Sequence, residues 1–130
     1  ILNRLKTSTR AGRIRLLDRV PDDALPALYA GADAFLTASF YEGFGLPPLE
    51  AMACGTPVVS SSGGALKEVL DQAAQVIDDY DVAQWVHAVE RLLGDTSFRQ
   101  SQVQAARDRA AAFRWESTAA KTWEVYRSLV

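Results

Sequence analysis

The fold is decided by one stretch of the chain, YEGFGLPPLEAMACGTPVVSSSGG, which covers residues 41–64. It contains two glutamates, five glycines, three prolines and the only cysteine of the chain. Gly43 and Gly45 permit backbone conformations and close approaches that a side chain would block. Pro47 and Pro48 suit the first turn of a helix, where the N–H groups have no acceptor within the helix. The stretch therefore predicts a glycine turn that leads directly into a helix.

Short apolar runs alternate with helical patterns on both sides of this turn. Runs of this kind, bounded by polar residues or glycine, are typical of buried parallel strands. The alternation predicts an α/β fold, namely a Rossmann-like, doubly wound parallel sheet followed by a C-terminal helical segment. The expected strands are Ile14–Leu17, Ala34–Thr37, Pro57–Ser60 and Ala74–Ile77.

Capping residues and prolines mark the expected helices of the first half. Asp22 is expected to cap a helix that continues to Gly31, because an aspartate side chain can accept from free N–H groups of the first turn. Pro47 or Pro48 is expected to open the next helix, which ends before Gly55. A short helix over residues 65–70 follows the third strand.

Helical patterns fill the chain after the last strand. Asp81 is expected to cap one helix, and Ser97 with Gln100 forms a possible capping box for the next. Apolar residues then recur at helical spacing in the final segment, which predicts a stripe that packs in the core. The stripe consists of Trp115, Ala119, Trp123, Tyr126, Leu129 and Val130.

Composition narrows the class of protein. With 130 residues, 48% hydrophobic and 23% charged, the chain fits one soluble domain over residues 1–130. A single cysteine excludes an internal disulfide and favours a reducing compartment such as the cytoplasm. Residues 1–19 hold six Lys and Arg against one Asp, but no aromatic residue that could stack on bases, so nucleic acid is not favoured as a partner.

The turn lies where parallel sheets bind ligands, beyond the carboxyl end of a strand and at the N-terminus of the next helix. Free N–H groups and the helix dipole make such a turn a site for phosphate or diphosphate. Glu42 and Glu50 would repel a phosphate, but they can accept hydrogen bonds from neutral hydroxyl groups on either side of it. The alternative is that both carboxylates are merely solvated.

The residues EGFGLPPLE, from Glu42 to Glu50, closely resemble the E-x7-E motif of retaining family 4 glycosyltransferases with the GT-B fold. The resemblance continues through VPDDALPALYAGAD before the motif, through VVSSSGGALKEVL after it, and into FRWESTAAKTWEVY near the end. It covers roughly residues 13–130. It implies that the chain is part of the nucleotide-sugar-binding C-terminal domain of a larger two-domain enzyme.

The resemblance also implies a role for each residue of the turn. Glu42 would face the donor sugar at the reacting carbon and act as the catalytic residue. The donor-binding residues would be Gly43, Phe44, Gly45 and Leu46 at the sugar and diphosphate, Glu50 at the ribose hydroxyls, and Arg19 and Val20 near the base. The donor would be a UDP-, GDP- or ADP-sugar, used without a cofactor or a metal.

The chain also departs from the family pattern. No R-x4-K arrangement after a strand is present to clamp the diphosphate, and Ala38-Ser39 stands where the family commonly has Pro-Ser. The acceptor, a sugar, lipid or small molecule, would be bound by an N-terminal domain that this stretch does not include. The whole protein is expected to be cytoplasmic, possibly peripheral to a membrane.

Three other interpretations remain open from the sequence. Asp79 and Asp81 form a D-x-D that could hold a metal, although capping of the following helix explains Asp81 better. A nucleotide-sugar epimerase could share the scaffold. A non-catalytic folding or assembly fragment could associate with further copies through exposed sheet edges.

Overall fold

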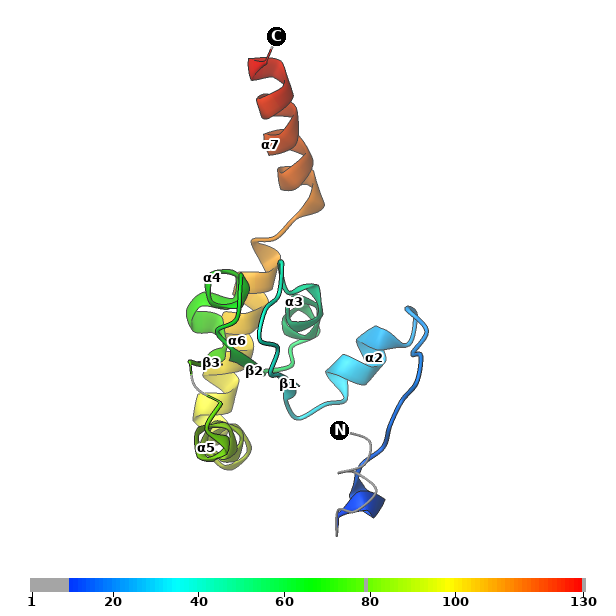
Figure 1. The fold of residues 1–130 in the computed structure, drawn as a ribbon, viewed down its shortest axis with the longest axis vertical. Coiled ribbons are helices and arrows are strands. Elements are labelled where there is room, and N and C mark those ends of the chain that lie inside the picture. Colours follow the sequence, from blue (N-terminus) through cyan, green and yellow to red (C-terminus); the bar gives the residue numbers. More distant parts are fainter. Residues whose placement is uncertain (1–9, 79, 130) are drawn as a thin grey trace.

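The computed structural model describes residues 10–78 and 80–129 of the chain. A three-stranded parallel sheet in the order β1-β2-β3 lies at its centre (Figure 1). The strands are β1 (Phe35–Thr37), β2 (Val58–Ser61) and β3 (Gln75–Ile77), and their bounds differ from the expected ones by at most one residue. The predicted parallel α/β sheet is therefore confirmed.

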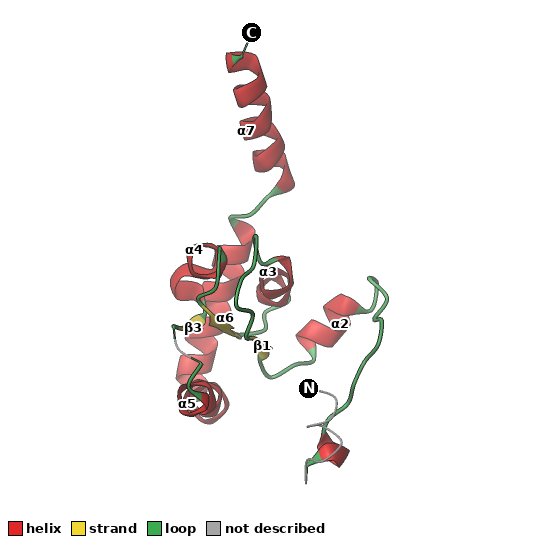
Figure 2. Cartoon of the chain, viewed as in Figure 1, coloured by secondary structure: helices red, strands yellow, loops and turns green. Residues whose placement is uncertain are grey.

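Helices connect and flank the strands, as the cartoon in Figure 2 shows. The glycine turn leads into a helix that contains both prolines in its first turn, as the sequence predicts. The bounds of the helices and 3-10 turns are η1 (Ala11–Arg13), α2 (Leu25–Ala30), α3 (Leu46–Ala53), α4 (Leu66–Leu70), η2 (Asp71–Ala73), α5 (Val82–Gly94), α6 (Thr96–Ala111) and α7 (Trp115–Ser128).

The central strand β2 is buried on both faces of the sheet. Val58 belongs to an apolar cluster with residues of α3, α4 and α6, whereas Val59 belongs to a second cluster with Ile77 and residues of α5. Successive side chains of a strand point to opposite faces, so the two valines face different layers of helices. This two-sided burial is why β2 is continuously apolar at its start.

The predicted strand Ile14–Leu17 is wrong. Residues 14–17 have no regular structure and are exposed, and the three-stranded sheet described above contains no strand beside them. A strand needs a neighbouring strand to bond its N–H and C=O groups. Without a neighbouring strand, an apolar run cannot form the backbone hydrogen bonds that define a strand.

Two of the predicted caps are also wrong. Asp22 does not cap α2, because residues 22–24 form a turn first and the helix begins only at Leu25, without a side-chain cap. The capping box of Ser97 and Gln100 is replaced by Asp95, whose carboxylate accepts from the Phe98 N–H at 2.9 Å. A charged acceptor two residues earlier outcompetes the serine, and the Ser97 hydroxyl instead donates to Asp95.

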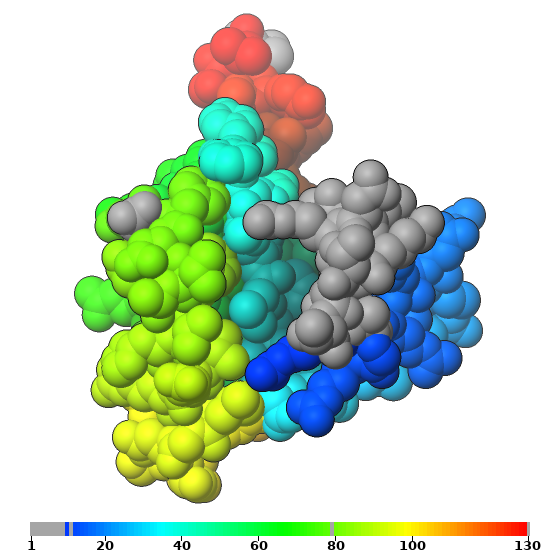
Figure 3. All heavy atoms as spheres, turned by 60° about the horizontal axis from the view of Figure 1, so that its bottom comes forward, coloured from blue at the N-terminus to red at the C-terminus, as the bar shows by residue number. Residues whose placement is uncertain are grey.

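The aromatic stripe of the last helix does not pack in the core of this chain. Helix α7 projects away from the sheet in Figure 1, and its red residues also stand clear of the body in Figure 3. Trp115, Trp123 and Tyr126 are 79%, 63% and 60% exposed. The spacing predicted the helix correctly, but the stripe has no apolar surface of the described residues to cover it. Val130 lies outside the described residues.

The cap of α6 gives a prediction that depends on pH. The backbone N–H of Phe98, the Ser97 hydroxyl and nearby Arg91 hold the pKa of Asp95 below its ordinary value of 3.8. A lowered pKa means that this carboxylate stabilises the fold above 3.8, and that its contribution disappears as the pH falls through the folded-state pKa.

We therefore expect Asp95→Ala to lower the urea midpoint at neutral pH, and the difference from the wild type to shrink steadily below pH 3.8. Denaturation followed by circular dichroism at several pH values measures this. Ser101→Ala, which changes an exposed residue of the same helix, serves as the control. A difference that is constant with pH would show that the Asp95 charge is irrelevant to the cap.

Candidate functional site

The turn before α3 has a backbone that only glycine adopts easily. Gly45 is the N-cap residue, with φ of 101° and ψ of 48° in the left-handed region. A Cβ atom at this position would also lie 2.8 Å from Cδ2 of the buried Leu66. Glycine is therefore required at position 45 for two reasons: its left-handed dihedral angles and the close approach of α4.

The turn offers a set of unused backbone donors. Pro47 and Pro48 have no N–H group, and the N–H of Leu49 bonds the Gly45 carbonyl at 3.4 Å. Among the interactions of the described residues, none uses a backbone N–H of residues 43–46 as its donor. These N–H groups lie at the positive end of the α3 dipole, which favours an anion.

Glu42 is held at the start of the turn by the loop that follows β2. Its carbonyl accepts from the Ala65 N–H at 3.0 Å, and it forms an isolated parallel bridge with Gly64. Ser39 donates its hydroxyl to Oε1 of Glu42 at 2.7 Å. Oε2 of Glu42 has no hydrogen-bond partner within the part of the chain that the structure describes, so it can accept from a ligand.

The loop after β2 comes close to the loop after β1 because it is built from small residues. A Cβ atom on Gly63 or Gly64 would collide with the backbone of residues 39–42. The Ser61 hydroxyl donates to the Ser39 carbonyl at 2.6 Å, and the Tyr80 hydroxyl reaches the same carbonyl at 3.3 Å. The serine and glycine loop thus supports the position of Glu42.

Glu50 lies on the other side of the turn and is held by α2. The Tyr29 hydroxyl donates to Oε2 of Glu50 at 3.1 Å. Tyr29 is fixed in turn by its ring, which packs edge-on against Phe35 at 5.7 Å. Burial, and then the adjacent Glu50 carboxylate, raise the pKa of Tyr29 above 10.0, so its hydroxyl stays a donor at neutral pH.

The remaining residues of the turn border an apolar pocket of about 330 Å³ between α3, the end of α6 and the start of α7. Phe44 and Leu46 are about half exposed there, at 45% and 49%. The Phe44 ring packs edge-on against Phe113, with the ring centroids 5.8 Å apart. The structure thus brings together Glu42, Gly43, Phe44, Gly45, Leu46 and Glu50.

Arg19 and Val20 are not part of this arrangement. They line a separate groove formed by residues 15–21 and the side of α2. Figure 1 shows this blue segment on the far side of α2 from α3. The structure brings neither residue to the turn, and their predicted place near the base stays a prediction.

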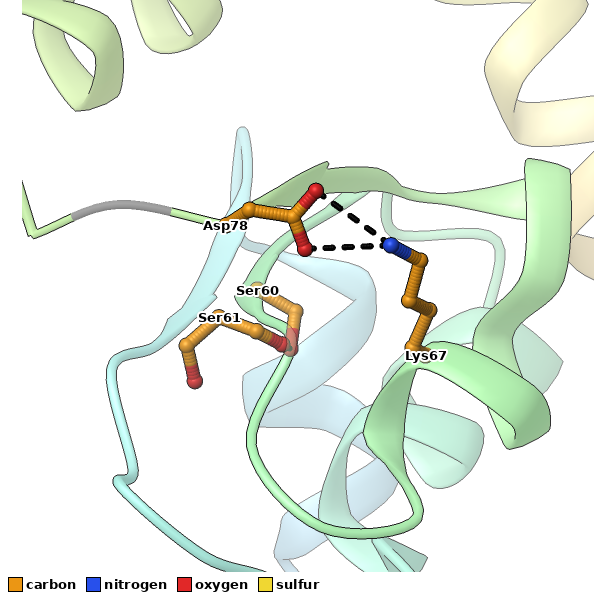
Figure 4. Close-up of polar contacts among 4 residues, drawn as sticks. All are labelled: Ser60, Ser61, Lys67 and Asp78. Atoms are coloured by element: carbon orange, nitrogen blue, oxygen red, sulfur yellow. Dashed lines mark hydrogen bonds and ion pairs between the residues drawn. The ribbon is translucent and has the colours of Figure 1, made fainter.

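An ion pair lies beside the same edge of the sheet. Figure 4 shows the Lys67 ammonium group reaching both carboxylate oxygens of Asp78, at 3.2 and 3.3 Å, while the Ser61 side chain points away from it. The Ser62 hydroxyl and then Lys67 lower the pKa of Asp78. Both charges are more than 65% exposed, so the pair contributes little to stability, but it joins the end of β3 to α4.

The D-x-D segment shows a structural role where it is described. Asp81 caps α5 by accepting from the Ala83 N–H at 3.0 Å, as the sequence predicts, whereas Asp79 lies outside the described residues. Residues 10–78 and 80–129 contain no group of three or more His, Cys, Asp or Glu residues placed to hold a metal ion. No helix within these ranges is long and apolar enough to cross a membrane.

Sequence reasoning missed Tyr29, Ser39 and Phe113 as neighbours of the site. Two of them act across a distance in the fold: Tyr29 bonds a residue 21 positions later, and Phe113 packs on Phe44 from beyond α6. Ser39 drew attention only as part of the pair Ala38-Ser39, where the family commonly has Pro-Ser, although its spacing of three residues from Glu42 suits a hydroxyl–carboxylate bond.

The parallel sheet, with a glycine turn and a helix at its carboxyl edge, defines a Rossmann-like domain of the GT-B type. Residues 5–109 match the family model described as Glycosyl transferases group 1. The chain therefore belongs to the group 1 glycosyltransferases, and the predicted family and fold are confirmed.

Individual relatives agree with this membership. The chain is 43% identical over 125 residues to O-antigen chain mannosyltransferase B of Escherichia coli, which covers 96% of the chain and 33% of that protein. It is 44% identical over 115 residues to a D-inositol 3-phosphate glycosyltransferase of Salinispora arenicola, covering 87% of the chain and 26% of the relative.

A solved structure shows the same fold. Sucrose-phosphate synthase from Thermosynechococcus elongatus superposes with a TM-score of 0.84 at 28% sequence identity, covering 98% of the chain and 34% of that structure. The chain thus spans about a third or less of the length of these relatives.

The two glycines of the turn give a matched pair of variants. Gly45→Ala should lower the free energy of unfolding by about 1–3 kcal/mol, because it forces alanine into the left-handed region and against Leu66. Gly43→Ala should change it by about 0.5 kcal/mol or less, because a Cβ atom there meets nothing within 4 Å. Urea denaturation measures both, and equal losses would contradict the assigned turn geometry.

Proposed function

We propose that this chain is the donor-binding part of a retaining glycosyltransferase that transfers a sugar from a nucleoside diphosphate sugar to an acceptor. The observation that carries the proposal is the row of N–H groups over residues 43–46, from which no described residue accepts, flanked by Glu42 and Glu50. Membership of the group 1 glycosyltransferases supports the transferase class.

The diphosphate of the donor binds to the turn. Its negative charge is matched by the backbone donors of Gly43, Phe44, Gly45 and Leu46 and by the dipole of α3. Backbone donors suit this task because they are already oriented before the ligand arrives. No metal is required for charge neutralisation in this proposal.

The two carboxylates bind the neutral hydroxyl groups at the two ends of the diphosphate. Each has one oxygen held by a hydroxyl of the protein, from Ser39 for Glu42 and from Tyr29 for Glu50. The remaining oxygens accept from the donor, Glu42 from the sugar and Glu50 from the ribose. Because each carboxylate accepts from hydroxyl groups and not from the diphosphate, two glutamates can lie beside an anion site.

The reaction is a displacement on one face of the sugar. A bond forms between the acceptor oxygen and the anomeric carbon while the bond from that carbon to the diphosphate oxygen breaks. The hydroxyl proton of the acceptor passes to the departing diphosphate. Glu42 stabilises the positive charge that develops on the sugar ring, and the turn stabilises the negative charge on the diphosphate.

The base, the sugar and the acceptor are not fixed by this half of the cleft. The relatives named above act, by their names, in mannosyl transfer and on an inositol phosphate, so they do not agree on one reaction. Arg19 and Val20 would contact the base only through a rearrangement that brings residues 15–21 toward Glu50. UDP, GDP and ADP are therefore all tested as ligands.

The proposed ribose contact gives a sharp test. We expect the chain to bind at least one of UDP, GDP and ADP in calorimetry, and to bind the 2′-deoxy form of that nucleotide about tenfold more weakly. Glu50→Gln should weaken binding of the ribonucleotide by about the same factor and remove the preference for it, because the charged acceptor is lost. The wild type and the variant should bind the deoxynucleotide alike.

Glu90→Gln is the matched control, because Glu90 is an exposed glutamate on α5. It should leave binding and the ribose preference unchanged. A ribose preference that survives Glu50→Gln would contradict the role of Glu50. No binding of any of the three nucleotides at millimolar concentration would favour the assembly fragment, for which the exposed stripe of α7 would supply the contact.

A second prediction concerns catalysis by the 130-residue chain alone. We expect no sugar transfer to water or to simple sugars above the uncatalysed rate, because the described residues form only one side of a cleft and offer the diphosphate no cationic clamp. Product analysis with UDP-, GDP- and ADP-sugars measures this. Efficient transfer, or interconversion of donor sugars without an acceptor, would contradict the proposal.

A further inference from the structure

A line of contacts joins the core of the domain to the turn. Arg109 of α6 donates from Nε to the Val69 carbonyl at 2.9 Å and from a terminal nitrogen to the Glu68 carbonyl at 2.8 Å. Its guanidinium group lies 4.9 Å from the centre of the Phe113 ring. Phe113 then meets Phe44 edge-on, at an interplanar angle of 85°.

The inner end of this line is rigid. Val69 of α4, whose carbonyl accepts from Nε, is buried in the apolar cluster below β2, so this carbonyl group moves little. Two hydrogen bonds from one guanidinium fix its plane, and a fixed cation attracts the face of an aromatic ring. Phe113 is therefore anchored, although it lies beyond the end of α6.

The outer end of the line is the turn itself. Gly43 has open space around it, and Phe44 is 45% exposed. Gly45 is held by its left-handed conformation and by Leu66, but Gly43, on the other side of Phe44, adds little local restraint on the backbone. The edge-on contact with Phe113 restrains the turn from outside, because an aromatic pair is stabilised by more than the burial of its apolar surface.

We propose that Phe113, held by Arg109, is a positioning residue for the turn over residues 43–46. It acts through the Phe44 ring, which fixes the direction of the neighbouring N–H groups before a ligand binds. Preorganised donors bind a diphosphate more tightly than donors that must first be ordered. The ligand part of this inference rests on the proposed function, whereas the restraint on the turn does not.

A plain packing role is the competing explanation, and the chain contains a matched pair that tests it. Arg91 lies over the ring of Phe98 at 3.6 Å, near the opposite end of α6. Phe98 packs against the cluster around Val59 and Leu92, far from the turn. Phe98→Leu therefore removes the same kind of cation–aromatic contact without touching Phe44.

The first measurement is amide hydrogen exchange in the absence of any ligand. Phe113→Leu should speed exchange at residues 43–46 by about fivefold while leaving β2 and α5 unchanged, and Phe113→Tyr should exchange like the wild type. Phe98→Leu should leave exchange at the turn unchanged, although it lowers the melting temperature. Equal effects of Phe113→Leu and Phe98→Leu on the turn would overturn the inference.

The second measurement is calorimetry with UDP, GDP and ADP. Phe113→Leu should weaken binding about fivefold, and Phe113→Tyr should restore it, whereas Phe98→Leu should bind like the wild type. If the wild type binds none of the three, the proposed function fails, and the exchange result alone decides the restraint on the turn. Normal binding by Phe113→Leu would overturn the positioning role even if the wild type binds tightly.

Discussion

The site depends on a backbone contact that only glycine allows. The loop after β2 crosses the loop after β1 so closely that a side chain on Gly63 or Gly64 would collide with residues 39–42. This approach lets the Ala65 N–H bond the Glu42 carbonyl and lets α4 begin directly below the turn. Leu66, at the start of α4, then fills the space that the missing side chain of Gly45 leaves. The position of Glu42 and the conformation of Gly45 therefore share one cause.

The contact also explains why the carboxyl edge of so small a sheet can hold a defined site. Each of the first two strands is short, and a short strand alone fixes the loop after it poorly. Here the Ser39 carbonyl accepts from both Ser61 and Tyr80, so the end of β2 and the loops after β1 and β3 meet at one atom. The Lys67–Asp78 pair ties the last strand to α4 from the other side (Figure 4). The carboxyl edge of the sheet is therefore held by hydrogen bonds and an ion pair between the segments that follow the strands, and not by long strands.

Local patterns predicted the elements whose partners lie within the chain. The three strands, the two prolines in the first turn of α3 and the Asp81 cap follow from short-range chemistry and from cores that the chain supplies itself. The pattern over Ile14–Leu17 failed because its strand partner is not among the described elements. The stripe of α7 failed for the same reason, since its helical period was correct but no apolar surface of the described residues covers it.

The residues of the site also fall into two groups: those that short-range sequence patterns predict, and those that depend on contacts between distant parts of the chain. The E-x7-E spacing places Glu42 and Glu50 on the two sides of the turn, and this was readable from nine residues. Of their hydroxyl partners, Ser39 lies only three residues before Glu42, whereas Tyr29 required the fold, because it reaches Glu50 only when α2 packs beside α3. The resemblance also implied a place near the base for Arg19 and Val20, and in this structure they line a separate groove beside α2.

The geometry of the two carboxylates leaves hydrogen-bonding capacity that the proposed donor would use. Each glutamate bonds one hydroxyl of the described residues and has a second oxygen without a partner among them. No described residue accepts from the N–H groups between them, and Pro47 and Pro48 remove donors that would otherwise compete for the same space. Water pairs such exposed groups in the free chain, whereas the proposed ligand, which carries an anion between two sets of hydroxyl groups, would pair them all at once.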